Sequence, residues 1–444
     1  MKAIAAAIVV CSLCVAAAAQ QSSDVSGEWV LTTDIMGTPL HQHLTLKAEQ
    51  GKLAGAIHRT SNDLKIEGTT SQRGIEFSFR DTDNSTGAYT GELQGQELRG
   101  DAKFAGPDPG DNFTGHWSAR RIPVERPSAA RVLEFTPTKF ERAFSSTVEP
   151  VLHIWPGDTV RTWTVDAGGV DSHSQARVLG GNPLTGPFYV ETAMPGDVLA
   201  VTLRRLRLNR DYAVSSGAIV GRGVTPDYQQ KIKGKTLNDS VRWKLDAQRG
   251  LATLDKPGEH LKSYSVPVRP MLGCIGVAPG FGRMPLIAGD SAGLGGNMDY
   301  NHIVEGATVY LPVAQPGALL YVGDGHALEG DGELTGNALE TSLDVEFTVD
   351  VRHQQRIGGP RVEDAEFISA VGLGGSLDEA IRQATVEMAN WLEQDYKLDP
   401  AEIAEVFGTA MQYDLVEVAD RNVGIAARLR KSLLAPLRPA SPVK

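Results

Sequence analysis

Short runs of alternating apolar and polar residues, separated by turn-forming residues, are the feature that most limits how this chain can fold. Between residues 26 and 121 the alternation is plain at 43–47, 74–79 and 114–119. A period of two places successive side chains on opposite faces of a strand, so each run predicts a half-buried antiparallel strand. The 48 Gly and 24 Pro among 444 residues exceed the usual combined share of about 12% and favour frequent turns. The sequence therefore predicts a mainly β protein.

The first β-rich region, residues 24–121, has room for about six to eight strands, which predicts a small antiparallel barrel or sandwich. Its opening Gly27-Glu28-Trp29 is similar to the start of lipocalin-like small barrels. Residues 122–130 contain two prolines and no periodicity, a composition typical of a linker. A second, larger β-rich unit is expected over residues 131–430.

Three Pro-Gly pairs in this second unit each precede an apolar run. They are Pro156-Gly157, Pro195-Gly196 and Pro316-Gly317. Proline presets the first central position of a type II turn and glycine supplies positive φ at the second, so each pair predicts a turn that leads into a strand.

After Gly375 the period of the apolar residues changes from 2 to about 3.6. Capping sequences at Ser376 and Asp399 predict two amphipathic helices, which extend to about Asp395 and about Gln412. Residues 431–444 are expected to form a flexible tail. The expected fold is thus mainly β and α+β overall, with a small barrel or sandwich, a larger β-rich domain and C-terminal helices.

The N-terminus resembles a cleaved secretory signal, which predicts an exported protein that is periplasmic or secreted. Lys2 precedes an apolar run that ends at Ala17-Ala18-Ala19, so residues 1–19 form the expected signal. Cleavage would remove Cys11 and Cys14 and leave Cys274 as the single cysteine. The mature protein would then contain no intramolecular disulfide.

The charge balance bears on the partners of the chain. It has 43 Lys plus Arg against 54 Asp plus Glu, a formal net charge of -11, which argues against nucleic acid as a partner. No run beyond the signal is long and apolar enough to span a membrane. A homo-oligomer remains a candidate assembly.

Acids, glycines and two histidines are concentrated in residues 289–340, where four interpretations compete. In the first, Ser291 is the nucleophile of a serine esterase, because Gly289-Asp290-Ser291-Ala292-Gly293 fits G-x-S-x-G. A nucleophile elbow needs a helix after the serine, yet the following Leu294-Gly295-Gly296-Asn297 is a poor start for a helix.

The second interpretation is a metal or acid/base centre. Asp324 and His326 would share one face of a strand, which makes half of a metal site. Two carboxylates that differ in burial and charge environment can act as a base and an acid. The residues considered are Asp299, Asp324, His326, Asp331 and Glu333. The alternative is a polar loop of turn-forming Asp and Gly.

The third interpretation is a cysteine nucleophile at Cys274, although a lone cysteine between apolar residues is usually buried filler. The fourth is an exported β-rich protein that binds a ligand without catalysis.

Several sequence blocks resemble the acetamidase/formamidase family. They are GGNMD at 295–299, EGATVYLPV at 305–313, GALLYVGDGHALEGDGE at 317–333 and ALET at 338–341. Upstream, GPFYVETAMPGDVLAV at 186–201 and LGCIGVAP at 272–279 are similar to earlier parts of the same family. The resemblance covers about Val132 to Tyr413 and leaves out the first β region.

This resemblance implies a hydrolase that cleaves the C–N bond of short linear amides on a mostly β fold. It also implies site residues, each of which matches a family element: Asn297 and Asp299 in GGN-x-D, Asp324 and His326 in GD-x-H, Asp331 and Glu333 in GDGE, the following Glu340, and the early aspartate Asp166. Glu329 and His302 depart from the family pattern and are assigned no role.

We therefore expect a small amide as substrate and a divalent ion, zinc or calcium, as candidate cofactor. Asp299, His326 and Asp166 would hold the ion or a polarised water, and Glu333 would take and return a proton. Amide hydrolysis needs an activated nucleophile, stabilisation of charge at the carbonyl oxygen and an acid for the departing amine.

Overall fold

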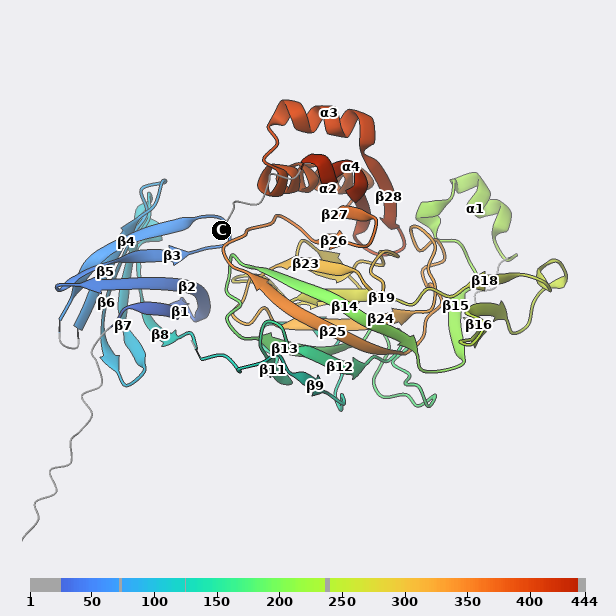
Figure 1. The fold of residues 1–444 in the computed structure, drawn as a ribbon, viewed down its shortest axis with the longest axis horizontal. Helices are drawn as coiled ribbons and strands as arrows, with labels where there is room; N and C mark the ends of the chain where they lie inside the picture. Colours follow the sequence, from blue (N-terminus) through green and yellow to red (C-terminus); the bar gives the residue numbers. More distant parts are fainter. Residues whose placement is uncertain (1–24, 72–73, 124, 236–239, 438–444) are drawn as a thin grey trace, which may run out of the picture.

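The computed structural model describes residues 25–71, 74–123, 125–235 and 240–437. Its first part forms a β barrel, and the rest forms a larger β-rich unit with helices along one side (Figure 1). The predicted mainly β fold, with an N-terminal barrel and C-terminal helices, is confirmed. The expected signal segment at 1–19 lies outside the described residues, as do residues 438–444 of the expected tail. In the described part of the chain, no helix combines the length and apolarity that a bilayer crossing requires.

Eight antiparallel strands close into the barrel, since β1 pairs with β8 as well as with β2. In chain order the elements are β1 Gly27–Ile35, β2 Thr38–Glu49, β3 Lys52–His58, β4 Asp63–Thr70, β5 Gly74–Arg80, β6 Thr86–Gln94, β7 Glu97–Ala105, the short 3-10 turn η1 Pro109–Asp111 and β8 Phe113–Arg121. Alternate side chains such as Trp29 and Leu31 are fully buried inside. Phe77 stacks on Tyr89 there, with ring centroids 4.6 Å apart. The barrel interior is thus a packed apolar core.

The larger unit is built on two main sheets. The nine-stranded sheet has the order β28 Gln412–Glu417, β29 Val423–Arg430, β27 Phe367–Gly374, β26 Arg361–Glu363, β23 Thr308–Pro312, β14 Val198–Leu208, β25 Leu343–Arg352, β12 Thr159–Trp163 and β9 Val132–Glu134. The six-stranded sheet has the order β11 Leu152–Ile154, β13 Leu184–Val190, β24 Leu320–His326, β19 Met271–Val277, β22 Gly295–Asn297 and β21 Ser291–Ala292. The main core lies between them and includes Phe188 of β13 and Phe347 of β25, whose ring centroids are 5.3 Å apart.

Strand β14 shows how the layers are joined. Leu199 and Val201 belong to the core between the two sheets, whereas Val198 and Ala200 belong to the core under the helices. Alternation along one strand therefore supplies both cores. The covering helices are α2 Leu377–Trp391, the π-helical turn η4 Leu392–Tyr396 and α3 Pro400–Ala410. Ser376 caps α2 by accepting from the Glu379 N–H, and α3 begins with a capping box at Asp399, so both predicted helices are confirmed.

Smaller elements surround this frame. They are the four-stranded sheet β15 Tyr212–Ser216, β16 Ser240–Asp246, β17 Leu251–Leu254 and β18 Ser265–Pro267, the pair β10 Ala143–Phe144 and β20 Leu286–Ile287, the helix α1 Pro226–Ile232, and the 3-10 turns η2 Gly221–Gly223 and η3 Glu259–Leu261. The three Pro-Gly turns have the predicted positive φ, at 94° for Gly157, 93° for Gly196 and 73° for Gly317.

Two features near the C-terminus differ from the sequence prediction. Strands β28 and β29 follow α3, where no strand was predicted, and complete one edge of the nine-stranded sheet. Residues 431–437, expected to be part of a flexible tail, form α4 Lys431–Leu434 and the 3-10 turn η5 Ala435–Leu437. Leu434 is buried in the core under the helices, and this apolar contact accounts for the order.

Candidate active site

Three side chains converge on Gly273, which lies within β19. A Cβ atom at this position would overlap Asp299 Oδ1 and lie 2.8 Å from Asp324 Oδ2 and 3.1 Å from His326 Cε1. Only glycine leaves room for this convergence. The sequence predicted that Asp324 and His326 would share a face of their strand, and the structure brings them together with Asp299.

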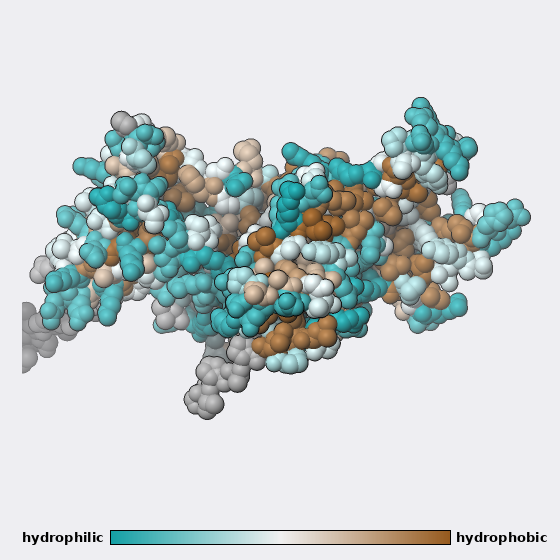
Figure 2. Space-filling view, turned by 90° about the horizontal axis from the view of Figure 1, so that it is seen from above, coloured by the Kyte–Doolittle hydropathy of each residue, from teal (hydrophilic) through white to brown (hydrophobic). Residues whose placement is uncertain are grey.

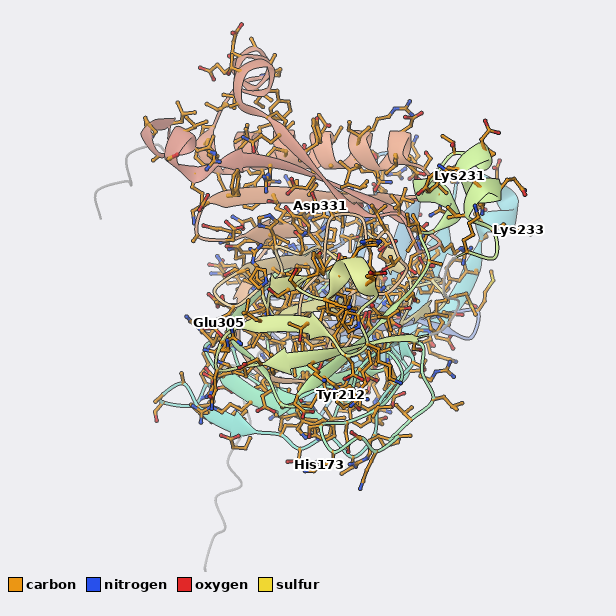
Figure 3. The ribbon with its side chains drawn as sticks, turned by 90° about the vertical axis from the view of Figure 1, so that its right-hand side faces the viewer. His173, Tyr212, Lys231, Lys233, Glu305 and Asp331 are labelled. Atoms are coloured by element: carbon orange, nitrogen blue, oxygen red, sulfur yellow. The ribbon has the colours of Figure 1, made fainter. Side chains whose placement is uncertain are left out.

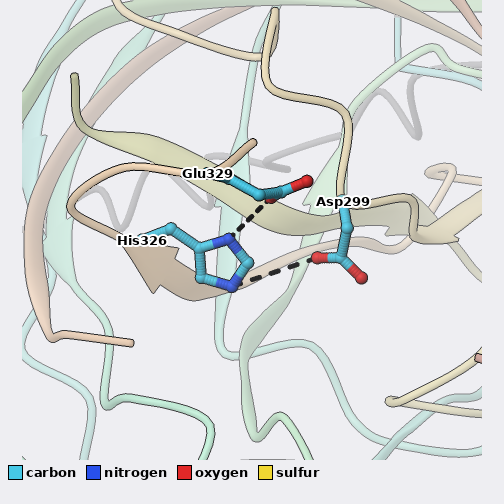
Figure 4. A group of neighbouring side chains, drawn as sticks. All are labelled: Asp299, His326 and Glu329. Atoms are coloured by element: carbon cyan, nitrogen blue, oxygen red, sulfur yellow. Dashed lines mark hydrogen bonds and ion pairs between the residues drawn. The ribbon is translucent and has the colours of Figure 1, made fainter. Parts of the chain in front are cut away.

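His326 lies at the centre of the cluster and is fully buried. Its Nδ1 is 2.9 Å from Glu329 Oε2 and its Nε2 is 4.0 Å from Asp299 Oδ1 (Figure 4). The Nε2 also lies 3.3 Å from Glu340 Oε2 and 3.5 Å from Asp324 Oδ2. Burial lowers the pKa of His326, but the carboxylates of Glu340 and Asp324 outweigh it and raise that pKa well above its usual value.

Asp299 also belongs to a second group, formed with Glu333 and Glu417. One carboxylate oxygen of each residue lies within 4.8 Å of the others. Burial raises the pKa of Glu333 to about 10, and the neighbouring Glu340 carboxylate adds to the increase. Burial likewise raises the pKa of Glu417 to about 7. The protein therefore holds more carboxylates here than it can keep ionised without a compensating positive charge.

Backbone conformation singles out the same residues. Asp299, Asp324 and Glu333 have φ values of 45°, 53° and 44°. Left-handed φ is unfavourable for residues other than glycine, and such strain concentrates at functional sites. Three acidic residues of one cluster share this conformation.

Several buried polar atoms of the cluster have no hydrogen-bond partner among the described residues. They are Asp299 Oδ1, Asp324 Oδ1, His326 Nε2, Glu329 Oε1, Glu340 Oε2 and Glu417 Oε2. Buried polar atoms are normally satisfied, so this number in one place indicates a missing partner. An imidazole nitrogen together with carboxylate oxygens is a donor set that can hold a divalent cation.

Asn297 positions Asp299. Its Nδ2 donates to Asp299 Oδ2 and, over 2.8 Å, to Asp420 Oδ2. Its Oδ1 accepts from Asn182 Nδ2 at 2.9 Å and from the Cys274 thiol at 2.7 Å. Asn297 thus connects the carboxylate cluster to three other segments of the chain.

The two nucleophile alternatives are not supported. Cys274 is fully buried, burial raises the pKa of its thiol well above the usual value, and the thiol donates to Asn297. A thiol in that state is a poor nucleophile. Ser291 lies on β21, which pairs with β22, so no helix follows it as an esterase elbow requires.

Two predicted site residues lie outside the cluster. Asp331 is exposed, and its Oδ1 accepts a 2.8 Å hydrogen bond from Asn301 (Figure 3). Asp166, predicted as a metal ligand, is buried but forms an ion pair of 2.7 Å with Arg210 Nη2. Arg210 Nη2 also donates to the main-chain carbonyl of Glu340 at 3.0 Å. The Asp166 side chain is thus engaged by Arg210, and among the described residues it belongs to none of the candidate metal groups.

We expect Asp166→Asn to destabilise the protein without emptying the candidate metal site. The change leaves the Arg210 guanidinium buried without its counterion, which costs about 3–5 kcal/mol in the free energy of unfolding. Urea unfolding measures this cost, and elemental analysis of the folded variant measures bound metal. If the folded variant lost its metal while its free energy of unfolding stayed the same, Asp166 would be a metal ligand as the sequence predicted.

Four residues of the site were missed in the sequence. Glu329 had been assigned no role because it departs from the family pattern, yet it bonds His326 directly. Asn182 Nδ2 donates to Asp324 Oδ2 at 2.9 Å. Glu417 and Asp420 lie at and after the end of β28, a strand that was not predicted. Glu417 reaches the site through a bridge with Gly332, where the Val418 N–H donates to the Gly332 carbonyl at 3.1 Å.

Comparisons with known proteins agree with this geometry. The model of the acetamidase/formamidase family matches residues 134–284 and 290–396. The crystal structure of a predicted acetamidase/formamidase from Thermoanaerobacter tengcongensis is 28% identical with a TM-score of 0.59, and the match covers 70% of this chain and 99% of that one. Acetamidase from Yersinia enterocolitica is 26% identical with a TM-score of 0.59, covering 69% and 94%. Acetamidase from Bacillus halodurans, at 24% identity and a TM-score of 0.58, covers 69% and 99% and supports the fold. No curated protein sequence matches the chain.

The two matched segments of the family model span more than half of the chain, and they contain most of the buried cluster around His326. The barrel, and the two residues Glu417 and Asp420, lie outside them. On this evidence the chain belongs to the acetamidase/formamidase family of amide hydrolases.

Proposed function

We propose that this protein hydrolyses the C–N bond of a linear primary amide. Water adds to the carbonyl carbon, the C–N bond breaks, and the products are a carboxylate and ammonium. One observation carries this proposal. The buried carboxylates of Asp324 and Glu340 converge on Nε2 of His326, and this nitrogen and one oxygen of each carboxylate have no hydrogen-bond partner among the described residues.

The residues that would hold a divalent cation are His326, Asp299, Asp324 and Glu340, with Glu329 orienting the imidazole through Nδ1. A divalent cation supplies Lewis-acid polarisation of the amide carbonyl and lowers the pKa of a water molecule. Zinc suits the mixed nitrogen and oxygen donors better than calcium, which prefers oxygen ligands alone.

The remaining chemistry falls to side chains of this chain. Asn297 fixes the orientation of Asp299, because it donates to Oδ2 and leaves Oδ1 free for another partner. We assign the proton transfer to Glu333, which is 7% exposed and faces Asp299 and Glu417. With its raised pKa, the protonated Glu333 carboxyl can donate a proton to the departing amine; it would accept a proton from water only once the positive charge of a bound cation lowered that pKa.

Ammonia release from a series of primary amides, from formamide and acetamide to hexanamide, tests the proposal. We expect release from at least one amide, loss of activity after dialysis against a chelator, and recovery on addition of zinc or calcium. If a metal-free preparation hydrolyses amides at the full rate, the cation has no part in the reaction. If no amide releases ammonia under any condition, the alternative of a ligand-binding protein without catalysis is favoured.

A further inference from the structure

A cleft of ≈ 1070 Å³ lies between the barrel and the larger unit. The barrel contributes residues 40–42 and 58–61, and the larger unit contributes segments that include 277–286, 292–294 and Arg421. This volume is at the upper end for small-molecule sites, which measure about 300–1,000 Å³. The family model begins at residue 134, so the barrel wall of the cleft lies outside the family-matched part.

The barrel is held in place by specific contacts. Val30 of β1, Ile122 and Met194 form one buried apolar cluster. Arg356 Nε donates to the main-chain carbonyl of Arg59 at 2.9 Å, and its Nη2 pairs with Asp63 on β4. These contacts fix the barrel against the larger unit, so the barrel side of the cleft has a defined position.

The cleft is positively charged in an acidic protein. Among the described residues, its lining contains three arginines and no aspartate or glutamate, although the chain has a formal net charge of -11. Arg59 is neutralised by Asp81 at 2.7 Å. Arg421 lies 3.8 Å from Asp290, and Arg283 has no ion-pair partner within the described part of the chain. Arg283 is thus the cation best placed to receive an anionic group.

Apolar side chains line the same cleft. Phe281 and Met284, which flank Arg283 on the loop between β19 and β20, are 40% and 84% exposed. Leu294, in the turn between β21 and β22, adds apolar surface, and the buried Val277 of β19 also lines the cleft. On the face of the molecule seen in Figure 2, exposed hydrophobic side chains gather mainly on the larger unit, while the barrel is mostly hydrophilic. An apolar chain with a charged end matches this combination.

The cleft and the carboxylate cluster share their supporting strands. Val277 lines the cleft three residues after Cys274 on β19, and Leu294 lines it from the turn just before β22. Cys274 pairs in register with Asn297 at the end of β22, which donates to Asp299. Arg421 on the cleft wall directly follows Asp420, whose Oδ2 accepts from Asn297. A ligand in the cleft therefore lies next to the segments that hold the site.

We propose that the cleft binds the acyl chain of an amide substrate whose apolar chain ends in an anionic group, with Arg283 receiving the charge. This inference rests on the proposed amide hydrolysis and extends it from short neutral amides to ω-carboxy amides. The barrel forms one wall of the cleft and so takes part in substrate selection.

The test uses the full chain and two independent measurements. Calorimetry measures the binding of hexanoate, butanoate and neutral hexanol, and ammonia release is followed for acetamide, hexanamide and adipamate. The variant is Arg283→Gln. The matched control is Arg249→Gln, an exposed arginine in the turn between β16 and β17 that does not line the cleft.

We expect hexanoate to bind more tightly than hexanol, and more tightly than butanoate by about fourfold per methylene. Arg283→Gln should weaken hexanoate binding and raise the KM for adipamate about tenfold, because a charge-assisted hydrogen bond is lost. The matched control Arg249→Gln should change none of these values.

If hexanoate does not bind, or binds Arg283→Gln and Arg249→Gln equally well, the cleft proposal is wrong even if the protein hydrolyses acetamide. Hexanoate binding that depends on Arg283, without ammonia release from any amide, supports the cleft as an anion-binding site and overturns the proposed hydrolysis.

Discussion

Glu333→Gln should lower kcat for amide hydrolysis by about 10²–10⁴, the range that a positioned general acid or base supplies. Glutamine keeps the size of the side chain and can still accept from the Ala338 N–H, which Glu333 Oε1 does at 2.8 Å. It cannot accept a proton from water or return one to the amine. Steady-state ammonia release at saturating amide measures the effect, and KM should change little.

Asp331→Asn is the matched control for this variant. It removes a carboxylate two residues earlier in the same Asp-Gly-Glu sequence, but Asp331 is exposed and lies outside the cluster. Its kcat should equal that of the unchanged protein. A Glu333→Gln protein with unchanged kcat would show that the proton transfer belongs to another residue.

His326→Gln should lower metal affinity and kcat/KM by about 100-fold or more. Removing a residue that only hydrogen-bonds to a metal ligand already lowers metal affinity or activity by about 10–100-fold. This change removes the ligand nitrogen itself. It also leaves Glu329, Asp324 and Glu340 buried around a neutral side chain, so the folded state should lose stability. Metal content per folded protein, measured by elemental analysis together with circular dichroism, separates the two effects.

His173→Gln is the control for the imidazole, because His173 is exposed and its labelled side chain lies at the periphery in Figure 3. This variant should retain both metal content and turnover. A folded His326→Gln protein with full metal content and full turnover would reduce His326 to a structural role.

Family membership fixes the fold and the class of reaction more firmly than it fixes the substrate. A fold hosts many specificities, and these depend on the groups that line each site. In this protein the cleft beside the site has a wall from the barrel, which the family model does not include. If the cleft binds substrate as proposed, substrate choice depends on the barrel as well as on the family-matched unit.

Local patterns in the sequence were sufficient for much of the fold. The alternation at 74–79 became β5, the capping sequences at Ser376 and Asp399 start α2 and α3, and the Pro-Gly pairs have the required positive φ. Strands β28 and β29 follow the end predicted for the second helix, at about Gln412, in a stretch for which the sequence analysis predicted no element. Their place at the sheet edge is fixed by the pairing of β29 with β27. Such pairing joins segments far apart in the chain, so a local sequence pattern does not predict it.

The site was partly predicted as well. The family motifs identified Asn297, Asp299, Asp324, His326, Glu333 and Glu340, and all six lie in or against the buried cluster. Asp331 was grouped with them, whereas its side chain is exposed and lies outside the cluster; an i, i+2 spacing does not show which side chain points into the protein. Asp166 was assigned to the ion, whereas its position opposite Arg210 makes it an internal counterion.

The sequence by itself determined the β-rich class, the two helices, the family and the central acid and histidine residues, because periodicity, capping and motifs depend on neighbours in the chain. Tertiary structure alone decided that Glu417 and Asp420 join the site, that Glu329 orients His326 and that the barrel forms a wall of the cleft. These relations join segments far apart in sequence, and they arise only when burial and strand pairing bring those segments together.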